Sequence, residues 1–498
     1  MTARDFALKV VQRLQQAGFI AYWAGGCVRD QLLGLDPKDY DVATDARPEQ
    51  IMALFPRRNE IGAAFGVVQV IGPRGPDGQW LTVEVATFRS DLGYSDGRRP
   101  DAVTYSSPQE DALRRDFTIN GMFYDPVRGV LIDYVGGQAD LEARRLRAIG
   151  NPWERFAEDK LRLLRAVRLA ARYQLTIEAE TLAAAKAMAA QITVVSPERI
   201  AEELRKMLRH KSRGQSVRLL RELELIPPLF PELVPTFSCP HRPTSTGPNT
   251  SLSASQGQAA AGATIWDHTV SVVDHLPEEA SFPLAMAALL HDIGKPELAQ
   301  EVPTVQSWEG HEQRGACRAQ AIAQRLRLAN AEKDRIVWLI AHQSALFAAP
   351  QQKPHRWRPL LVHPGAEELL ALHRAEALAN GGEHLDAVEY CERLLRESPR
   401  EWLDPPPLLR GGDLLALGIP QGPVIRRLLE AVRQAQWDGE IHTRSEALAM
   451  ALRLYAEVAQ ADGLTRPAEV PAEPAPSGET PSAAANGASN PATRNGTE

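Results

Sequence analysis

The chain has 498 residues, of which 44% are hydrophobic and 24% are charged, and its formal net charge is -7. This composition is typical of globular protein with two to four domains, and the lack of any apolar run of about 20 residues excludes a membrane-spanning helix. The four cysteines lie far apart and form no CxxC pair, which argues against a disulfide framework and a cysteine zinc site.

The first 150 residues alternate helical and strand-like patterns. Residues 1–19 predict an amphipathic helix and contain no targeting signal, so we expect a cytoplasmic protein. Short strands are predicted for FIAYWAGG, DYDVATDA, VVQVIG and WLTVEVATF, and the turn GPRGPDGQ joins the last two. We therefore expect a mixed α/β domain over residues 1–150.

Two aspartates lie one residue apart in the segment KDYDV. Side chains two residues apart on a strand point to the same face, so Asp39 and Asp41 are expected to project together. Carboxylate oxygens are the ligands that Mg²⁺ prefers, and two metal ions can clamp the attacking and leaving oxygens of a phosphoryl transfer. The pair predicts a Mg²⁺ site, with two solvated carboxylates on an edge strand as the alternative.

Gly25 and Gly26 follow the first strand, and Arg29 lies in the helix that should come next. Glycines let backbone N–H groups approach a triphosphate, and a guanidinium can hold a phosphate through two hydrogen bonds. A plain tight turn would also suit these glycines. Together with the aspartates they predict a nucleotide held against metal ions.

Further arginines are available for phosphate later in this domain. Arg89, Arg98 and Arg99 belong to the loop-like segment TFRSDLGYSDGRRPDAVTY, and Arg114 and Arg115 belong to RRDFTIN. For the last two, the alternative is a charged entry to a strand.

Residues 151–237 are predicted to be helical and to bind RNA. Eight arginines and one lysine between residues 144 and 172 form a basic band in an acidic protein, which is a candidate phosphate track. In the segment EDKLRLLRAVR, four charged residues recur every three positions and are expected to form one stripe of a helix: Asp159, Arg162, Arg165 and Arg168.

A carboxylate beside a guanidinium places a hydrogen-bond acceptor next to donors. Cytosine and adenine carry an amino donor beside a ring acceptor, whereas uracil and guanine carry a carbonyl at the equivalent position. An edge formed by Asp159 and Arg162 could therefore accept C and A and reject U and G. The alternative is a surface ion pair between residues three positions apart.

The rest of the chain divides into two helical regions and two low-complexity segments. Residues 238–263 and 462–498 are rich in small and polar residues and are expected to be disordered. Between them, residues 264–380 and 381–461 show helical patterns.

The successive motifs of the first 200 residues resemble those of the class II tRNA nucleotidyltransferase and bacterial poly(A) polymerase family. They are GGCVRDQLLG, KDYDVATDA, VEVATFRSDLGYSDGRRPDAVTY, RRDFTINGM and EDKLRLLRAVRLAAR, in the family's order. The resemblance implies an α+β protein, with a DNA polymerase β-like head followed by a helical neck and body. It also implies that Asp39 and Asp41 are the catalytic metal ligands, that Gly26, Arg29 and Arg115 contact the nucleotide, and that EDxxR is the nucleotide template.

A second set of motifs resembles the HD phosphohydrolase domain, which some bacterial members of that family carry. The segments WDHT, LLHDIGK, GHEQRGA, IAHQS and ALHRAEALA supply imidazole and carboxylate groups for a second divalent metal: His268, His291, Asp292, His311, His342 and Glu376. The sequence departs from the family in one position, because the last ligand is usually Asp and is here Glu376.

These observations predict a tRNA nucleotidyltransferase that adds CCA to tRNA 3′ ends from CTP and ATP with Mg²⁺, and no protein partner is implied. A poly(A) polymerase or an A-only adding enzyme would share the same motifs. Two further alternatives are an HD phosphohydrolase with a degenerate head and a non-catalytic RNA-binding protein.

Overall fold

The structure is a computed structural model that describes residues 1–59, 66–92, 102–241, 263–301 and 308–462. Two arginines expected to contact phosphate, Arg98 and Arg99, lie outside the described residues. Most of the expected insertion at 238–263 and the tail beyond residue 462 lie outside them as well.

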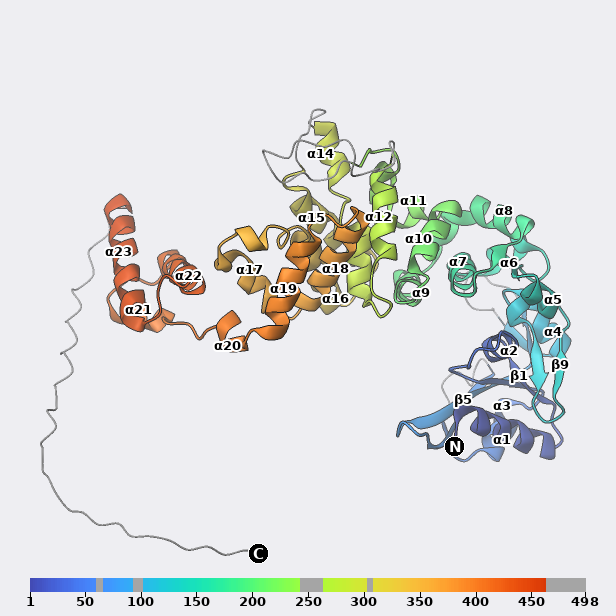
Figure 1. The fold of residues 1–498 in the computed structure, drawn as a ribbon. Helices are drawn as coiled ribbons and strands as arrows, with labels where there is room; N and C mark the ends of the chain where they lie inside the picture. Colours follow the sequence, from blue (N-terminus) through green and yellow to red (C-terminus); the bar gives the residue numbers. More distant parts are fainter. Residues whose placement is uncertain (60–65, 93–101, 242–262, 302–307, 463–498) are drawn as a thin grey trace, which may run out of the picture. The chain divides into compact units, whose positions relative to one another are not determined.

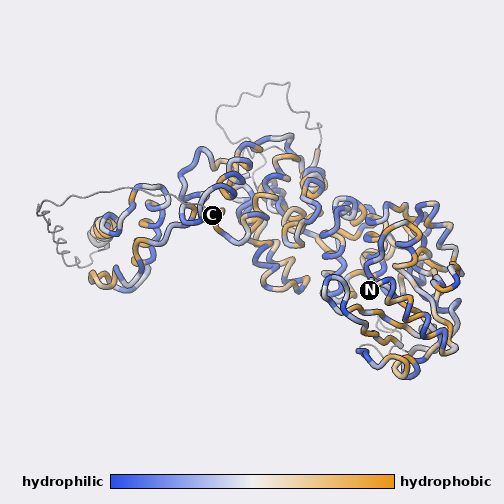
Figure 2. Tube along the Cα trace, turned by 60° about the horizontal axis from the view of Figure 1, so that its bottom comes forward, coloured by the Kyte–Doolittle hydropathy of each residue, from blue (hydrophilic) through white to orange (hydrophobic). Residues whose placement is uncertain are grey.

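The chain forms two compact units, each described by itself. Unit 1 comprises residues 1–352 and 359–398, and unit 2 comprises residues 353–358 and 399–498. Figure 2 shows apolar and polar residues interspersed along the helices of both units, as expected when each helix buries one side. Within the described ranges, no helix is long and apolar enough to cross a membrane.

The head of unit 1 is built on one seven-stranded sheet (Figure 1). Its strand order is β3-β4-β5-β2-β1-β8-β9, and β2 runs parallel to β5 while the other pairs are antiparallel. The strands are β1 (Ala21–Ala24), β2 (Asp41–Thr44), β3 (Arg58–Asn59), β4 (Val67–Arg74), β5 (Trp80–Thr87), β8 (Phe123–Asp125) and β9 (Val130–Ile132). Two small sheets pair β6 (Arg89–Leu92) with β7 (Ala102–Tyr105) and β10 (Arg145–Leu146) with β11 (Thr176–Ile177).

One face of the large sheet is apolar and is covered by helices. Alternate residues such as Val68, Val70, Val83 and Val85 are buried, and α1 (Ala3–Gln16) and α3 (Pro48–Leu54) pack on this side. The opposite face carries Asp41 and its neighbours, so the period-two pattern separates the core from the polar face. Other short helices of the head are α2 (Gly26–Leu32), α4 (Pro108–Leu113), η2 (Thr118–Asn120) and α5 (Gly137–Glu142).

The predicted strands are confirmed with one correction. The segments around residues 21–24, 67–74 and 80–87 form strands, and the last two are joined by the expected turn. The strand in DYDVATDA begins at Asp41, so Asp39 lies before it and not on it as predicted. The antiparallel partner β1 ends at Ala24, which lies opposite Asp41, so β2 has neighbours on both sides only from Asp41 onward.

A helical body follows the head, as predicted. Its elements are α6 (Pro152–Glu158), α7 (Arg162–Tyr173), α8 (Ala179–Met188), η3 (Ala189–Val194), α9 (Pro197–Leu208), α10 (Arg213–Glu222), α11 (Ile226–Leu229) and η4 (Pro231–Phe237). Buried Arg213 joins this body to the next helices, because its guanidinium donates hydrogen bonds to the carbonyls of Leu208, Leu276 and Glu278.

The remaining helices of unit 1 surround the expected metal cluster. They are α12 (Ile265–Asp274), α13 (Phe282–Leu290), α14 (Lys295–Glu301), α15 (His311–Arg325), α16 (Asn330–Ala341), η5 (Ala349–Gln351), α18 (Ala366–Ala379) and α19 (Leu385–Glu397). Helix α13 is buried almost along its whole length, because its sequence FPLAMAALL is apolar on every side. Helix α17 (Pro354–Leu361) contributes residues to both units.

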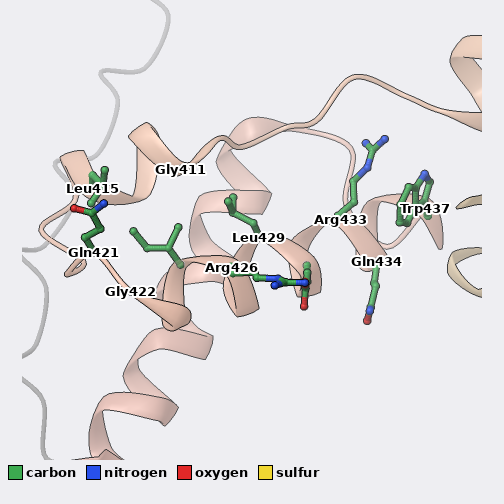
Figure 3. Close-up of a pocket in the computed structure, with 11 residues that line it drawn as sticks. Gly411, Leu415, Gln421, Gly422, Arg426, Leu429, Arg433, Gln434 and Trp437 are labelled. Carbon is green, nitrogen blue, oxygen red and sulfur yellow. The ribbon is translucent and has the colours of Figure 1, made fainter. Parts of the chain in front are cut away.

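Unit 2 is a small helical unit with its own core. Its helices are α20 (Arg400–Leu403), α21 (Gly411–Ala416), α22 (Pro423–Trp437) and α23 (Arg444–Asp462). A cavity of about 590 Å³ lies along α21 and α22, and Figure 3 shows Leu415, Leu429 and Trp437 among its lining residues.

Candidate active site

Two carboxylates lie in register on the open face of the head sheet, and a third, that of Asp39, lies two residues before Asp41 in the chain. Asp41 is the first residue of β2 and lies in register with Glu84 of β5, so the two side chains point to the same face. Asp39 and Asp41 are both exposed and are separated by buried Tyr40, which keeps the two aspartates on one side of the chain although Asp39 precedes the strand.

The surrounding protein raises the pKa of Asp41 to about 6, mainly by desolvating its carboxyl group. The charges of Glu84 and Asp39 add to this increase, and the charge of Arg115 opposes it. A cation placed among these carboxylates would be favoured because it relieves their repulsion. The carboxylate oxygens of Asp39, Asp41 and Glu84 suit Mg²⁺ by their donor chemistry.

Glu84 was missed by the sequence reasoning. Its position on the polar face follows from the alternation in WLTVEVATF, but its place beside Asp41 depends on the parallel pairing of β2 with β5. That pairing joins segments more than 40 residues apart and leaves no local signal.

Gly25 makes the turn between β1 and α2 in a backbone conformation that favours glycine. Its φ is +72°, and a Cβ atom there would lie 3.0 Å from Nη1 of Arg115. Gly26 is the first residue of α2, and a Cβ atom there would make only ordinary contact, 3.5 Å from Nη2 of Arg29. Gly25 is therefore required by its backbone conformation and by the closeness of Arg115, whereas neither reason applies to Gly26.

A cavity of about 410 Å³ adjoins the carboxylates. All eight residues predicted to bind the nucleotide line it, together with Asp41, whereas Asp39 is not among its lining residues. The lining residues are Gly25, Gly26, Arg29, Asp41, Arg114, Arg115, Asp116, Asn120, Asp159, Arg162, Arg165, Arg168 and Leu169. Six arginines against three aspartates make the cavity suitable for a polyanion.

Arg29 is held more firmly by the protein than expected. Its guanidinium is buried and donates to Asp30, to Oδ1 of Asn120 at 2.5 Å and to the Tyr173 hydroxyl at 2.5 Å. It also lies over the Tyr173 ring, 4.1 Å from the centroid. A two-pronged phosphate contact by Arg29 would have to replace some of these bonds.

Arg114 and Arg115 are fixed by one buried carboxylate. Asp111 accepts hydrogen bonds from both guanidiniums, at 2.6 Å from Arg114 and 3.0 Å from Arg115. Burial alone would raise the pKa of Asp111, but the two arginines hold it below its usual value. Arg115 also donates to the Asn120 carbonyl at 3.3 Å, which places it beside Gly25.

Asp159 and Arg162 both line the cavity, but they are arranged differently from the prediction. Helix α6 ends at Glu158, Asp159 is extended, and α7 begins at Arg162, so the stripe of four charged residues does not lie on one helix. The Asp159 side chain accepts a hydrogen bond from the Leu161 amide at 3.0 Å, which shapes the turn between the two helices.

Asp159 and Arg162 also have separate partners. Arg199 of α9 donates to both oxygens of Asp159, at 2.7 and 3.3 Å. Arg162 donates to Glu158 at 2.5 Å and to the Arg155 carbonyl at 2.8 Å. The alternative interpretation was an ion pair between Asp159 and Arg162. The structure describes both residues and shows no such pair, because each side chain is bound by other groups.

The other two arginines of α7 pair with buried carboxylates. Arg165 lies 2.6 Å from Asp116, and Arg168 lies 2.6 Å from Glu203 of α9. Burial would raise the pKa of Asp116, but the Arg165 charge and the hydrogen bond from Asn120 lower it strongly. Asp116 and Asn120 were also missed, although they belong to the motif RRDFTIN, because their partner Arg165 lies 49 residues from Asp116. The partners on α9 were missed because they are likewise distant in sequence from the residues that they hold.

The second predicted site forms a cluster in the interior of unit 1. We call His268, His291, Asp292 and Glu376 the HD cluster, and each of these side chains is buried. Within the described residues, four of its atoms have no hydrogen-bond partner: Nε2 of His268, Nε2 of His291, Oδ1 of Asp292 and Oε2 of Glu376. Ligand atoms of His268, His291 and Glu376 all lie within 4.8 Å of one another, so the longer Glu side chain reaches the cluster.

Electrostatics in the HD cluster also fits a cation. Burial raises the pKa of Glu376 to about 7, which a bound cation would reverse. Lys295 lies 2.8 Å from Oδ2 of Asp292, and its charge, with that of His291, helps to keep the pKa of Asp292 low against the effect of burial. Nitrogen and oxygen donors together suit a divalent transition metal.

Two of the predicted metal ligands, His311 and His342, are not among the residues whose ligand atoms lack hydrogen-bond partners. Both ring nitrogens of His311 have hydrogen-bond partners, the Trp308 carbonyl at 2.6 Å from Nδ1 and the Gln343 amide nitrogen at 3.0 Å from Nε2, and Nε2 lies 3.6 Å from Oδ1 of Asp292. His342 packs on Trp338 and contacts its carbonyl. A histidine not predicted, His241, stacks on His268 with ring centroids 4.0 Å apart.

Three family models match separate parts of the chain. Residues 21–147 match the "Poly A polymerase head domain", and residues 174–236 match the "Probable RNA and SrmB- binding site of polymerase A". Residues 265–381 match the "HD domain". The expected domain boundaries remain predictions.

Relatives of both kinds of enzyme match the chain at similar identity. A poly(A) polymerase I from Salmonella typhi is 40% identical over 246 residues, which cover 47% of this chain and 51% of the relative. A CCA-adding enzyme from Levilactobacillus brevis is 43% identical over 205 residues, which cover 41% and 50%. The chain therefore spans about half the length of the curated relatives it matches.

The fold is similar to that of a solved structure, the Bacillus stearothermophilus CCA-adding enzyme in complex with CTP. The TM-score is 0.64 at 23% identity, and the match covers 92% of this chain and 100% of that one. At this identity the likeness supports the fold alone, namely a mixed α/β head followed by helical domains.

Proposed function

We propose that the chain is a template-independent nucleotidyltransferase acting on RNA 3′ ends, which is supported by its matches to the head and RNA-binding models and to relatives named poly(A) polymerase I and CCA-adding enzyme. The observation that carries this proposal is the cavity that six arginines line together with Asp41, which lies in register with Glu84. The negative charge of a nucleoside triphosphate complements the arginines of this cavity. The adjacent carboxylates could hold the metal ion that activates the attacking RNA hydroxyl.

In this proposal the chain's own residues bind and orient the reactants. The arginines around the cavity neutralise the triphosphate, and Asp111 and Asp116 keep three of them in place: Arg114, Arg115 and Arg165. Mg²⁺ held by Asp39, Asp41 and Glu84 would lower the pKa of the attacking hydroxyl and absorb charge on the departing pyrophosphate. No covalent intermediate with the protein is needed.

The finer proposal is addition of CCA to tRNA from CTP and ATP. Asp159 and Arg162 line the same cavity as acceptor and donor, and their separate partners leave them fixed without pairing to each other. Such an edge is complementary to the amino and ring nitrogen atoms of cytosine and adenine. The helical body would hold tRNA through backbone charge and shape.

The experiment is nucleotide incorporation on tRNAs that end in the discriminator base, in C and in CC. We expect CTP to be used on the first two ends and ATP on the third, with no incorporation of UTP or GTP. Use of ATP alone on every end would reject CCA addition in favour of poly(A) or A-only addition, which the 40% identical poly(A) polymerase I supports as a second candidate.

Two double variants separate the head from the HD domain. Replacing Asp39 and Asp41 by Ala should abolish incorporation, whereas replacing His291 and Asp292 by Ala should leave it largely intact. The free ligand atoms of the HD cluster favour metal-dependent phosphohydrolysis as a separate activity. Incorporation that survives loss of both aspartates would overturn the proposed role of the head.

A further inference from the structure

The open face of the head sheet extends well beyond the three carboxylates. On β5, Trp80, Thr82 and Glu84 alternate with residues that face the core, so they share one face with Asp41. On the two neighbouring strands, Asn59 pairs with Gln69, and Gln69 lies in register with Glu84. The amide of Asn59 donates to Oε1 of Gln69 at 2.9 Å.

Trp80 lies at the far end of this face between two arginines. Its side chain is 50% exposed, and the guanidiniums of Arg57 and Arg74 lie 5.6 and 5.1 Å from the centroid of its ring. Arg74 is in register with Trp80 across the hairpin. Neither guanidinium forms an ion pair with any carboxylate in the part of the chain that the structure describes.

We propose that this face binds the single-stranded 3′ end of the RNA substrate, with a base stacked on Trp80 and the backbone phosphates held by Arg57 and Arg74. This inference rests on the proposed function, because it supplies the path that leads the reacting hydroxyl to the carboxylates. Aromatic rings and guanidinium planes are the groups on which unpaired bases stack.

The spacing fits a few nucleotides. Trp80 and Glu84 are four residues apart on one strand, which corresponds to about 13 Å. Stacked nucleotides advance by about 3.4 Å, so a base on Trp80 would lie roughly four nucleotides from the reacting end. Between the two points lies Thr82, whose hydroxyl can donate or accept, and beside Glu84 the Asn59–Gln69 pair adds amide donors and acceptors. Such groups suit unpaired bases of any sequence.

The positive charge and the amides favour RNA over a protein partner. The chain as a whole has a net charge of -7, so a polyanion would be drawn to this face by its local arginines and not by the total charge. An interface for a protein would be expected to present a cluster of apolar side chains, whereas the groups that contact the Trp80 ring are the guanidiniums of Arg57 and Arg74.

The test is equilibrium binding of a fluorescent RNA hairpin with a four-nucleotide 3′ overhang, compared with the same hairpin without the overhang. Trp80→Ala should weaken binding of the overhang RNA by about 5- to 150-fold, the range for loss of one stacked base. Trp80→Phe should retain most of the affinity. The hairpin without an overhang should bind all three proteins within about twofold of one another, since it has no base to stack.

The arginines are tested through the salt dependence of the same equilibrium. Each phosphate contact to a single strand contributes about 0.7 to the slope of log K against log salt, so Arg57→Gln with Arg74→Gln should reduce the slope by about 1.4. Arg128→Gln is the matched control, because Arg128 is an exposed arginine of the same head whose only described ion pair, to Asp125, is 3.8 Å long.

Failure of this inference is distinct from failure of the proposed function. If Trp80→Ala bound the overhang RNA as tightly as the wild-type chain, or weakened both RNAs equally, the proposed platform would be wrong even if incorporation were normal. If the wild-type chain incorporated no nucleotide on any RNA, the proposed function would fall, and the binding data would still decide whether this face holds a 3′ end.

Discussion

Gly25 shows how a single residue without a side chain shapes the cavity. Its positive φ is strained for any other residue by roughly 1–2 kcal/mol, and a Cβ atom would press on Arg115. We expect Gly25→Ala to lower the free energy of unfolding of the head by about that amount and to reduce incorporation severely. Urea unfolding and the incorporation assay measure the two effects.

Gly26→Ala is the matched control for this prediction. Gly26 begins α2 in ordinary helical geometry, where alanine is favoured over glycine by up to about 1 kcal/mol. The free energy of unfolding of the Gly26→Ala protein should therefore equal that of the wild-type chain or be slightly higher. Equal destabilisation by the two substitutions would show that the backbone conformation of Gly25 is not the reason for its effect.

His373 should make the stability of unit 1 depend on pH. The ring is completely buried, Nδ1 donates to the Leu369 carbonyl, and burial lowers its pKa to about 4 from 6.5. Below pH 6.5 the unfolded chain binds a proton that the folded chain resists, so stability falls from pH 6.5 to pH 4, by about 3 kcal/mol in all.

His373→Leu should remove this part of the pH dependence. Urea unfolding at several pH values between 4 and 7 measures the slope, and His275→Leu is the control because His275 is exposed. A His373→Leu protein with the wild-type slope would contradict the account of His373 as a buried neutral group.

At the residue scale, the sequence could predict the functional residues that belong to short local motifs. The eight predicted nucleotide residues all line one cavity, and each belongs to one of the short motifs that the sequence shows. The partners that hold them were not predictable, since Asp116, Arg199 and Glu203 lie up to 49 residues away from the arginines and the aspartate they pair with. Pairing across such separations depends on packing, which a single sequence does not reveal.

At the scale of elements, α9 supports the cavity with one face and contacts later helices with another. Arg199 and Glu203, four residues apart, hold Asp159 and Arg168, while Arg205 pairs with Glu332 of α16. Residues four apart lie on one side of a helix, whereas Arg205 points elsewhere. The helix therefore positions the proposed base-reading edge.

We expect Arg199→Met to impair base selection. Without its partner the Asp159 carboxylate can turn away, and the ratio of kcat/KM for CTP over UTP should fall about tenfold, within the range for loss of one base-reading contact. Arg205→Met, on the other side of α9, should leave the ratio within about twofold and lower stability by no more than about 1 kcal/mol. The same fall in both variants would mean that α9 acts only through stability.

The two errors at this scale have physical reasons. The three-residue period from Asp159 to Arg168 suggested one helix, but an aspartate side chain competes for nearby backbone amides, and Asp159 binds the Leu161 amide at the break between α6 and α7. The strand predicted around Asp39 begins only at Asp41, which lies opposite Ala24, the last residue of its antiparallel partner β1. Strand and helix types were thus predictable, and their ends were not.

At the scale of the whole molecule, unit 1 combines the nucleotide cavity with a buried group of ligands. Among the residues that the structure describes, four polar atoms of the HD cluster have no hydrogen-bond partner, which is costly in a folded interior unless a cation binds. Sequence patterns brought these four residues together correctly, because their motifs are specific. They did not show that His311 is occupied by Trp308 and Gln343.

We expect Glu376→Asp to weaken metal binding although it introduces the residue usual in the family. The backbone of α18 is fixed, so the shorter carboxylate would retreat by about 1.5 Å from the imidazoles, and affinity should fall about tenfold or more. Co²⁺ titration followed by visible absorption measures this, in a background with Asp39→Asn and Asp41→Asn to remove the head site. Glu312→Asp is the control, and an unchanged affinity in Glu376→Asp would argue against Glu376 as a ligand.

The central claim is that one cavity holds the triphosphate beside Asp39, Asp41 and Glu84 and the base beside Asp159 and Arg162. A crystal structure of the full chain with a non-hydrolysable CTP analogue and Mn²⁺, located by its anomalous signal, tests this most directly. The account predicts Mn²⁺ within about 2.5 Å of the Asp39 and Asp41 carboxylates, with the cytosine amino group facing Asp159. Mn²⁺ found only at the HD cluster, or a cytosine bound outside the cavity, would contradict it.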